Sequence, residues 1–342
     1  MGAGWLIRGM SVPKRIVVVG GGTGTYTLLR GLKHYVPDVH LTAIVTMADS
    51  GGSTGRLRDQ FGYLPVGDVR QALAALAPED DAHQELLRQL FLYRYEKGEG
   101  LTGHNFGNLL LTALTDITGS EVAAIGAAAT LLRVAGSVVP VTTEPANLVA
   151  QYDTGVEVVG EHAIDEQTVC PGETIAALTL RPRVALNPDA AAALAAADCI
   201  VFGPGDLYTS ILANCVVDGF AAAVGASAAR RVYILNLMGK ACQTQHLDAA
   251  AHVAELERYL GCALTHVVVP SEAPAPALVA RYQRAGDTVI DPAPWSDARK
   301  VPGAIIAPEA TTPQPGDTLQ RSYIRHDSTA LAALLYRLAM TA

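Results

Sequence analysis

The sequence predicts an α/β protein built on a doubly wound, mostly parallel sheet, with a helical insertion and a small antiparallel β excursion. Short apolar segments alternate along the chain with longer segments of helical periodicity, and glycine-rich turns follow several of the apolar segments. Half of the 342 residues are hydrophobic and only 17% are charged, so the chain has enough apolar side chains for a large core. Because strands that are apolar on both faces must be covered on both faces, we expect helices on both sides of the sheet.

The first strand is expected at residues 15–19, where a run of β-branched side chains (RIVVV) precedes a glycine turn. A helix is expected over 24–35, because its leucines fall on one face. The next apolar strand covers 40–47. Three later strands each follow a stretch rich in Ala or Leu, at 198–203, 230–236 and 265–270. This alternation is typical of a Rossmann-like fold.

Two segments interrupt the alternation. Residues 67–133 have the pattern of several successive helices. Residues from about 137 to 181 instead contain short alternating segments, and the DTG at 153–155 has the composition of a hairpin turn. We therefore expect a helical insertion followed by a small antiparallel excursion.

The remaining boundaries are less sharply marked. The Pro-rich segment 270–316 is expected to be the least regular part of the chain. The last segment has the pattern of a helix that Asp327 or Ser328 could cap. We expect residues 1–14 to be an N-terminal extension and residues 15–342 to form one domain.

Charge and cysteine content limit the class of protein. The formal net charge of -8 argues against a surface built mainly to bind nucleic acid, although a pocket for small anions remains possible. Five cysteines without a CxxC pair give an odd count, which predicts neither a disulfide framework nor a zinc knuckle and fits a reducing cytoplasm. No apolar run approaches the ~18 residues of a membrane-spanning helix. A homodimer is compatible with so apolar a chain.

The first glycine turn lies between the first strand and its helix. It contains Gly20, Gly21, Gly22, Thr23 and Gly24. Exposed backbone N–H groups at the start of a helix favour a phosphate group. The spacing is neither the dinucleotide fingerprint GxGxxG nor a Walker loop with its lysine, and glycines also allow close packing of strand and helix. Phosphate binding and close packing therefore both remain open for this turn.

The second turn, TMADSGGSTGRLR, follows the second strand at its carboxyl end. Asp49 is expected to point into the crevice above the sheet, and Gly51 and Gly52 would let the backbone pass close to a ligand. Ser53 adds a hydroxyl donor, and Arg56 could bind phosphate oxygens with its planar fork of donors. The alternative is a surface loop with solvated charges.

The third turn, CIVFGPGDLYTS, again follows a strand. It supplies Gly203, Gly205, Asp206 and Tyr208 as candidate ligand-binding residues. Another strand ends at Asn236. Because the carboxyl ends of parallel strands share one edge of the sheet, we expect these turns to meet in one crevice.

A helix start in GHNFGN supplies three further candidates for the crevice: His104, Asn105 and Asn108. Taken singly, each could be a capping, core or turn residue. Asp49 and Asp68 could together hold a magnesium ion, since Mg²⁺ usually takes one or two carboxylates plus water and substrate phosphates. The alternative reading of these two aspartates is a loop carboxylate and a helix N-cap.

Six segments, in this order between residues 15 and 327, closely resemble the YvcK family of gluconeogenesis factors, a branch of the CofD-like superfamily formerly called UPF0052. They are VVVGGGTGTYTLLRGL, TMADSGGSTGRLR, PVGDVRQALAAL, YRYEKGEGLTGHNFGNLLLTALTDITG, CIVFGPGDLYTS and IRHD. The resemblance implies a Rossmann-like CofD fold in a cytoplasmic protein that is needed for cell shape and envelope synthesis on gluconeogenic carbon sources. It also implies binding of a UDP-sugar such as UDP-N-acetylglucosamine, without an assigned reaction.

The sister enzymes of that superfamily imply an alternative. They transfer a 2-phospho-L-lactate group to the deazaflavin Fo, with magnesium and a guanosine diphosphate leaving group, and Asp49 and Asp68 resemble their metal-binding aspartates. The GGSTGRLR and GHNFGN segments resemble the YvcK branch instead, which favours ligand sensing. A nicotinamide-dependent oxidoreductase ranks last, because no acidic residue stands where a ribose would be bound.

The resemblance also implies two UDP-sugar contacts near the C-terminus. They fall on Tyr282 and on Arg325 of the IRHD segment. A tyrosine can stack on uracil, and an arginine can bind diphosphate. The sequence departs from the family pattern at residues 239–246, where Lys240, Cys242 and His246 replace a Pro-Gly turn and an acidic pair. A redox or metal role for Cys242 and His246 is possible, but the interpretation favoured here is an ordinary loop.

Overall fold

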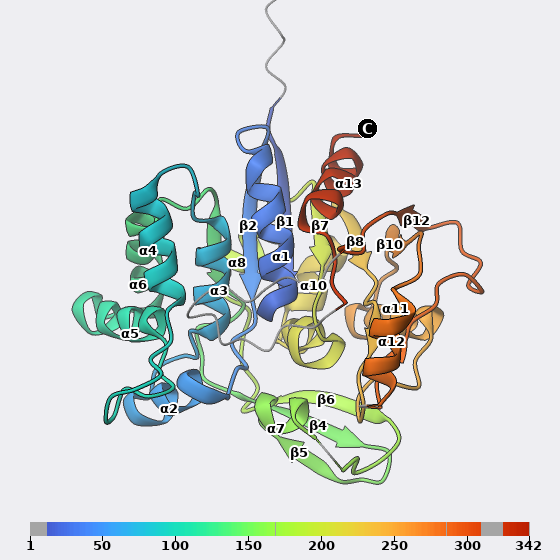
Figure 1. Ribbon diagram of the computed structural model, residues 1–342, viewed down its shortest axis with the longest axis horizontal. Coiled ribbons are helices and arrows are strands. Elements are labelled where there is room, and N and C mark those ends of the chain that lie inside the picture. The colour runs from blue at the N-terminus through green and yellow to red at the C-terminus, as the bar shows by residue number, and fades with distance from the viewer. Residues whose placement is uncertain (1–11, 168, 285, 309–323, 342) are drawn as a thin grey trace, which may run out of the picture.

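The computed structural model describes residues 12–167, 169–284, 286–308 and 324–341 (Figure 1). Its main sheet has seven strands in the order β12-β10-β8-β7-β1-β2-β3, and every neighbouring pair is parallel. The strands are β1 (Lys14–Gly20), β2 (Val39–Val45), β3 (Ser137–Pro140), β7 (Cys199–Phe202), β8 (Arg230–Ile234), β10 (His266–Pro270) and β12 (Lys300–Gly303). This sheet confirms the predicted doubly wound α/β class.

The strand order reverses at β1. The chain adds β2 and β3 on one side of β1, and later adds β7, β8, β10 and β12 on the other side. All four residues of β7 are buried, as are the last five of β1, because both faces of the sheet are covered. In open α/β sheets, the crevice at such a reversal is where ligands bind.

Two groups of helices cover the sheet. Helix α1 (Gly22–Leu32) packs against α3 (Gly67–Leu76) and α13 (Ser328–Met340), and α1 and α13 lie in front of the sheet in Figure 1. Helix α10 (Phe220–Ala226) packs against α8 (Pro188–Ala196) and α11 (Ala249–Leu260). Asp327 caps α13, because its Oδ1 accepts the N–H of Ala330 at 2.7 Å, as one of the two predicted caps.

The predicted helical insertion is present as four helices: α3, α4 (Ala82–Leu92), α5 (Phe106–Thr118) and α6 (Glu121–Leu131). Three of them begin at side-chain caps, namely Asp81, Asn105 and Ser120. Helix α2 (Gly52–Phe61) precedes the insertion and ends at Gly62, whose φ of +75° favours glycine. A short 3-10 turn, η1 (Lys33–Tyr35), continues α1.

The antiparallel excursion is smaller than predicted. Strand β3, within the range 137–181, pairs parallel with β2 and is the edge of the main sheet. Antiparallel pairing starts with β4 (Asn147–Tyr152), which lies between β5 (Glu157–Val159) and β6 (Ile175–Arg181). We call these three strands and the short helix α7 (Glu161–Asp165) the β-unit. Figure 1 shows the β-unit beyond the carboxyl ends of the main-sheet strands.

The Pro-rich segment is less irregular than predicted. Its described part contains α12 (Pro276–Gln283), β11 (Thr288–Val289), which pairs with β9 (Met238–Gly239), and the edge strand β12. A π-helical turn, η2 (Leu207–Leu212), and α9 (Ala213–Cys215) follow β7. Most of the expected N-terminal extension lies outside the described residues.

One prediction from the cysteine count is wrong. Cys170 and Cys242 form a disulfide across 72 residues of chain, and the other three cysteines are free. An odd count excludes only the pairing of all five cysteines, so it carries no information about one long-range pair. The expectation of an ordinary loop at Cys242 is corrected with it.

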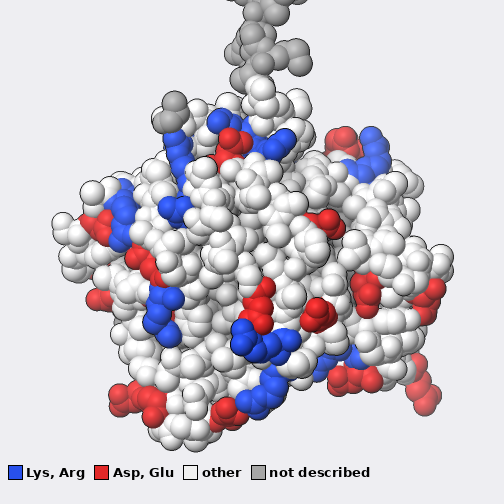
Figure 2. Space-filling view, turned by 180° about the vertical axis from the view of Figure 1, so that it is seen from behind, with Lys and Arg blue, Asp and Glu red and all other residues white. Residues whose placement is uncertain are grey.

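The described surface is mixed in charge. On the described part of the face in Figure 2, Lys and Arg side chains alternate with Asp and Glu, and broad uncharged areas separate them. Within the described residues, no helix has both the length and the apolar character needed to cross a membrane.

Candidate functional site

A cleft of about 650 Å³ lies at the carboxyl ends of the main-sheet strands. Its lining comes from the turns after β1, β2 and β7, the start of α3, helix α7 of the β-unit and the segment after β8. The end of α12, Asp287 and residues 324–326 complete it. The three predicted glycine turns therefore meet at one site, as expected for the edge of a parallel sheet.

The first turn is packed tightly against its neighbours. Gly21, Gly22, Thr23 and Gly24 line the cleft, whereas Gly20 ends β1 outside the lining. A Cβ atom on Gly24 would lie 2.3 Å from the carbonyl oxygen of Pro204, so no side chain fits between the first and third turns. Of the two explanations for the glycines of this turn, close packing therefore applies at Gly24, where only glycine fits.

Two half-buried aspartates meet at the first and second turns. Asp68 Oδ1 accepts the N–H of Gly22 at 2.8 Å, and Asp49 Oδ1 accepts the N–H of Gly51 at 2.9 Å. Burial raises the pKa of Asp49. Burial and the neighbouring Asp49 charge raise the pKa of Asp68 to about 7. Besides Asp49, the second turn contributes Gly51, Gly52, Ser53 and Thr54 to the lining.

The predicted magnesium site falls on these two carboxylates. No group of three His, Cys, Asp or Glu side chains in the described residues is arranged to hold a metal ion. The charge of Asp49 raises the pKa of Asp68, so the two carboxylates face one another closely enough to share a Mg²⁺ ion, which completes its shell with water and phosphate oxygens. Asp49 and Asp68 thus fit the ion as a two-carboxylate site.

Only some of the ligand-binding residues predicted in the third turn face the cleft, and the others are directed elsewhere. Gly205 and Asp206 line the cleft together with Pro204 and Ser210, whereas Gly203 precedes the lining. Tyr208 is 2% exposed, and its hydroxyl donates to Glu255 Oε1 at 3.1 Å on α11. The π-helical turn therefore directs Ser210 to the cleft and Tyr208 into the core.

The GHNFGN segment lies mostly behind the cleft. Asn108 reaches the lining, but Asn105 caps α5 by accepting the N–H of Asn108 at 3.3 Å. His104 Nδ1 lies 3.2 Å from the Ser53 hydroxyl, and His104 is not part of the lining. Burial lowers its pKa. Its role in the structure is to support the second turn.

The arginines near the second turn differ from the prediction. Arg56 is exposed, lies outside the lining, and donates to the carbonyl oxygen of Thr102 at 3.2 Å. Arg70 is 3% exposed, lines the cleft, and donates through Nε to Asn108 Oδ1 at 2.9 Å. Arg94 also reaches the lining. Sequence analysis did not select Arg70, although it lies within the PVGDVRQALAAL segment, near the start of the mostly buried helix α3.

The β-unit supplies residues that the sequence did not indicate. Glu161 of α7 lines the cleft, and its burial and the charge of Asp49 raise its pKa to about 9.

Lys240 Nζ lies 3.0 Å from Asp206 Oδ2 and also forms an ion pair with Asp165 of α7. Burial alone would lower the pKa of Lys240, but the two aspartates outweigh burial and raise it.

The C-terminal candidates are brought together as predicted by the resemblance. Tyr282, Arg325 and Asn236 all line the cleft. The Tyr282 hydroxyl accepts the N–H of Ile324 at 3.3 Å, which joins α12 to the segment before α13. His326 lines the cleft too, and burial lowers its pKa to about 4, so its imidazole is neutral at pH 7. His246 and Cys242 lie outside the lining.

A sequence model described as 2-phospho-L-lactate transferase CofD matches residues 16–304. The chain belongs to the CofD family. A Thermotoga maritima protein named "Putative gluconeogenesis factor" is 38% identical over 95% of this chain and 99% of its own length. The gluconeogenesis factor of Bacillus subtilis is 36% identical over 95% of this chain and 98% of its own length. A solved structure of a UPF0052-family protein from Bacillus halodurans superposes with a TM-score of 0.82 at 34% identity, over 95% of this chain and 99% of that chain.

These comparisons confirm both the predicted CofD-like fold and the resemblance to the YvcK branch of the CofD family. The relatives named above match over 95% of this chain, so the likeness extends through most of the helical insertion and the β-unit.

Proposed function

We propose that this chain is a gluconeogenesis factor that binds a nucleotide sugar of the UDP-N-acetylglucosamine class in the cleft. We further propose that it acts in the cytoplasm and connects carbon supply to envelope synthesis and cell shape. The observation that carries the proposal is the meeting of three glycine turns with Tyr282 and Arg325 around one cleft.

Each part of such a ligand has a counterpart in the lining. Backbone N–H groups at the starts of α1 and α2 suit phosphate oxygens. Arg325 suits the diphosphate, and Tyr282 offers a ring for uracil. Buried carboxylates can accept hydrogen bonds from sugar hydroxyls.

The carboxylates in the cleft lining repel an anionic ligand, and two effects reduce this repulsion. The raised pKa of about 9 keeps Glu161 protonated at pH 7, and the value of about 7 leaves Asp68 close to half protonated. A magnesium ion held by Asp49 and Asp68 would neutralise charge there and supply a Lewis acid next to the phosphates. We therefore expect magnesium to strengthen binding of the nucleotide sugar.

A second candidate is a magnesium-dependent transferase that moves a 2-phospho-L-lactate group to the deazaflavin Fo. The description of the matching family model and the Asp49–Asp68 pair favour it. In that reaction Arg325 and the glycine turns would hold the diphosphate of the leaving nucleotide, and Lys240 would offset the charge that develops on it.

Calorimetry separates the candidates. UDP-N-acetylglucosamine, GDP and NAD are each titrated into the full-length chain, with and without Mg²⁺. We expect heat of binding from UDP-N-acetylglucosamine, tighter with Mg²⁺, and none from NAD. Binding of GDP alone, and only with Mg²⁺, would overturn the sensor proposal and support the transferase.

A further inference from the structure

The disulfide is outside the cleft lining and connects two segments next to residues that do line the cleft. Cys170 belongs to the segment between α7 and β6 of the β-unit, and Cys242 belongs to the loop after β9. Two residues before Cys242 stands Lys240, whose ammonium group pairs with Asp165 of α7 and Asp206 of the third turn. The disulfide and the Lys240–Asp165 ion pair thus both join the β-unit to this loop, and the Lys240–Asp206 pair joins the loop to the third turn.

We propose that the Cys170–Cys242 disulfide is a thiol-exchange site, and that its reduction weakens binding of an anionic ligand by releasing the loop that carries Lys240. The inference rests on the proposed function, because the ligand affected is the one proposed for the cleft.

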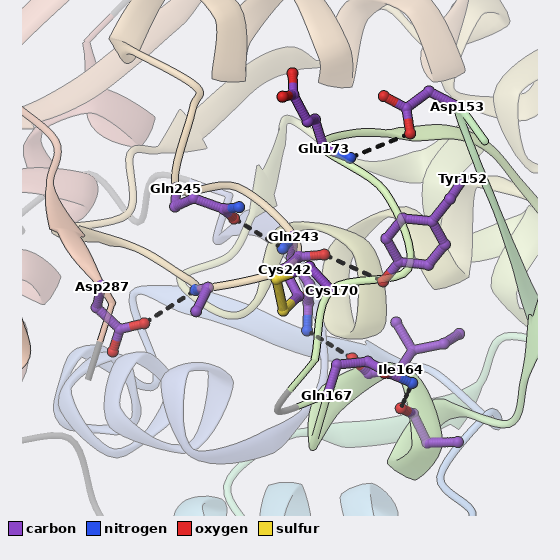
Figure 3. Close-up of a disulfide and its surroundings, with 12 residues drawn as sticks. Tyr152, Asp153, Ile164, Gln167, Cys170, Glu173, Cys242, Gln243, Gln245 and Asp287 are labelled. Carbon is purple, nitrogen blue, oxygen red and sulfur yellow. Dashed lines mark hydrogen bonds between the residues drawn. A yellow bond between two sulfur atoms is a disulfide. The ribbon is translucent and has the colours of Figure 1, made fainter. Parts of the chain in front are cut away.

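Besides the disulfide, the loop is held by hydrogen bonds to several neighbouring segments and by the Lys240 ion pairs. Figure 3 shows the Tyr152 hydroxyl donating to the Cys242 carbonyl oxygen at 3.1 Å, and the Ala241 N–H donating to Asp287 at 3.0 Å. Gln243 donates to the Ile164 carbonyl oxygen at 3.2 Å. Cys242 itself has a φ of +60°, a conformation that costs a residue with a side chain roughly 1–2 kcal/mol. The loop therefore has a reason to relax when the crosslink is removed.

The position of Lys240 decides the direction of the effect. When Lys240 is held in place, its charge offsets Asp165 and Asp206 at the turn proposed to bind phosphate. When the loop moves, the two aspartates stay and repel an anion. The reduced protein is therefore expected to bind the nucleotide sugar more weakly than the oxidised protein.

The two sulfur atoms differ in access, which gives the exchange an order. Cys170 is exposed, and Cys242 is 2% exposed. A glutathione thiolate attacks the sulfur of Cys170, forms a mixed disulfide there, and releases Cys242 as a thiolate that takes up a proton. A second glutathione attacks the mixed disulfide and leaves Cys170 as a thiol. The protein gains two electrons and two protons, and two glutathione molecules become one oxidised glutathione.

The competing explanation is a permanent structural crosslink. Permanent crosslinks are usual in oxidising compartments, whereas disulfides in reducing compartments of mesophiles are mostly transient and redox-sensing. The two explanations differ in one measurable respect. A structural disulfide in a folded chain resists the glutathione pool, and a sensing disulfide exchanges with it.

The test equilibrates the full-length chain in buffers of increasing ratio of reduced to oxidised glutathione and then alkylates free thiols for peptide mass spectrometry. We expect Cys170 and Cys242 to be protected in the oxidised protein and to become alkylated together within that series. Hydrogen exchange on the same samples should become faster in residues 169–173 and 241–245 on reduction. Protection of both cysteines until the chain unfolds would overturn the proposal.

Calorimetry with UDP-N-acetylglucosamine then measures the consequence for the cleft. Reduction and the Cys170→Ser substitution should weaken binding alike, by about fivefold or more. The Lys240→Gln variant should bind equally in both redox states, and the Cys262→Ser control should keep the full difference. Equal affinity of the oxidised and reduced wild type would refute the inference. If UDP-N-acetylglucosamine binds neither state, the proposed function fails, and the thiol-exchange site is decided by the alkylation and hydrogen-exchange results.

Discussion

Arg325 is the residue through which the segment before α13 reaches the cleft. It lines the cleft beside Tyr282, whose hydroxyl accepts the N–H of Ile324. This hydrogen bond fixes the backbone next to Arg325. The restraint limits the conformational entropy that the arginine loses when a ligand binds.

The Arg325→Ala substitution should weaken binding of UDP-N-acetylglucosamine by roughly ten- to a hundredfold, because hydrogen bonds to a charged group are worth about 1.5–3 kcal/mol. Calorimetry measures the change, and thermal unfolding verifies that the variant is folded. Arg337→Ala is the control, since Arg337 is exposed on the last turn of α13 and outside the cleft lining. Unchanged affinity in Arg325→Ala would remove this arginine from the proposed site.

At the scale of elements, the C-terminal helix is held by one close crossing. A Cβ atom on Gly31 of α1 would lie 2.2 Å from the carbonyl oxygen of Ser328 and 2.7 Å from the Cβ of Ala332. Ser328 also donates its hydroxyl to the Thr27 carbonyl oxygen at 2.7 Å. Because Arg325 and His326 directly precede α13, this crossing also sets their approach to the cleft.

Gly31→Ala should lower the free energy of unfolding by about 1–3 kcal/mol, since α13 must move away from α1. The matched control is Gly126→Ala in α6, where a Cβ atom meets nothing within 4 Å. That control should raise stability by about 0.5–1 kcal/mol through helix propensity alone. Urea unfolding of both variants measures the difference, and a Gly31→Ala protein as stable as the control would show that the helices separate at no cost.

At the scale of the whole molecule, the sequence predicted those strands of the main sheet that have a local apolar pattern. The strands β1, β2, β7, β8 and β10 have continuous apolar runs, so their type and parallel pairing followed from periodicity. Strand β12 was missed because its four residues include Pro302 and its pairing with β10 is non-local.

The candidate site was predictable to a similar extent. The glycine turns and Asp49 follow strands, and topology alone brings them to one edge. Glu161 and Asp165 have no motif, because they reach the cleft only when the β-unit folds over the strand ends. The direction of the Tyr208 side chain depends on a π-helical turn, and the disulfide depends on two residues 72 positions apart. Neither feature leaves a pattern in the sequence.

One charged cluster ties the helical insertion to the first helix and makes global stability depend on pH. Glu79, between α3 and α4, pairs with Arg30 at 3.1 Å and with Lys33 at 3.1 Å, and Arg88 of α4 lies 3.9 Å away. Lys33 and Arg88 have side chains that are only 4% exposed. Burial lowers the pKa of Lys33 in spite of Glu79. For Glu79, burial favours the neutral acid, but the hydrogen bond from Arg30 and the charge of Lys33 outweigh it and lower the pKa to about 2.

A folded-state pKa of about 2 lies below the ordinary value of 4.5, so the ionised carboxylate stabilises the folded chain. That contribution is complete above about pH 4.5 and is lost as the pH falls toward 2. Glu79→Gln should therefore lower the free energy of unfolding by about 2 kcal/mol at pH 7, and the difference from wild type should shrink between pH 4.5 and pH 3. Urea unfolding across that range measures it, with Glu99→Gln in an exposed loop as the control. A difference that stays constant from pH 7 to pH 3 would mean that the Glu79 carboxylate does not stabilise the fold through its charge, and that the buried cations are balanced by Glu85 and the Ala77 carbonyl oxygen instead.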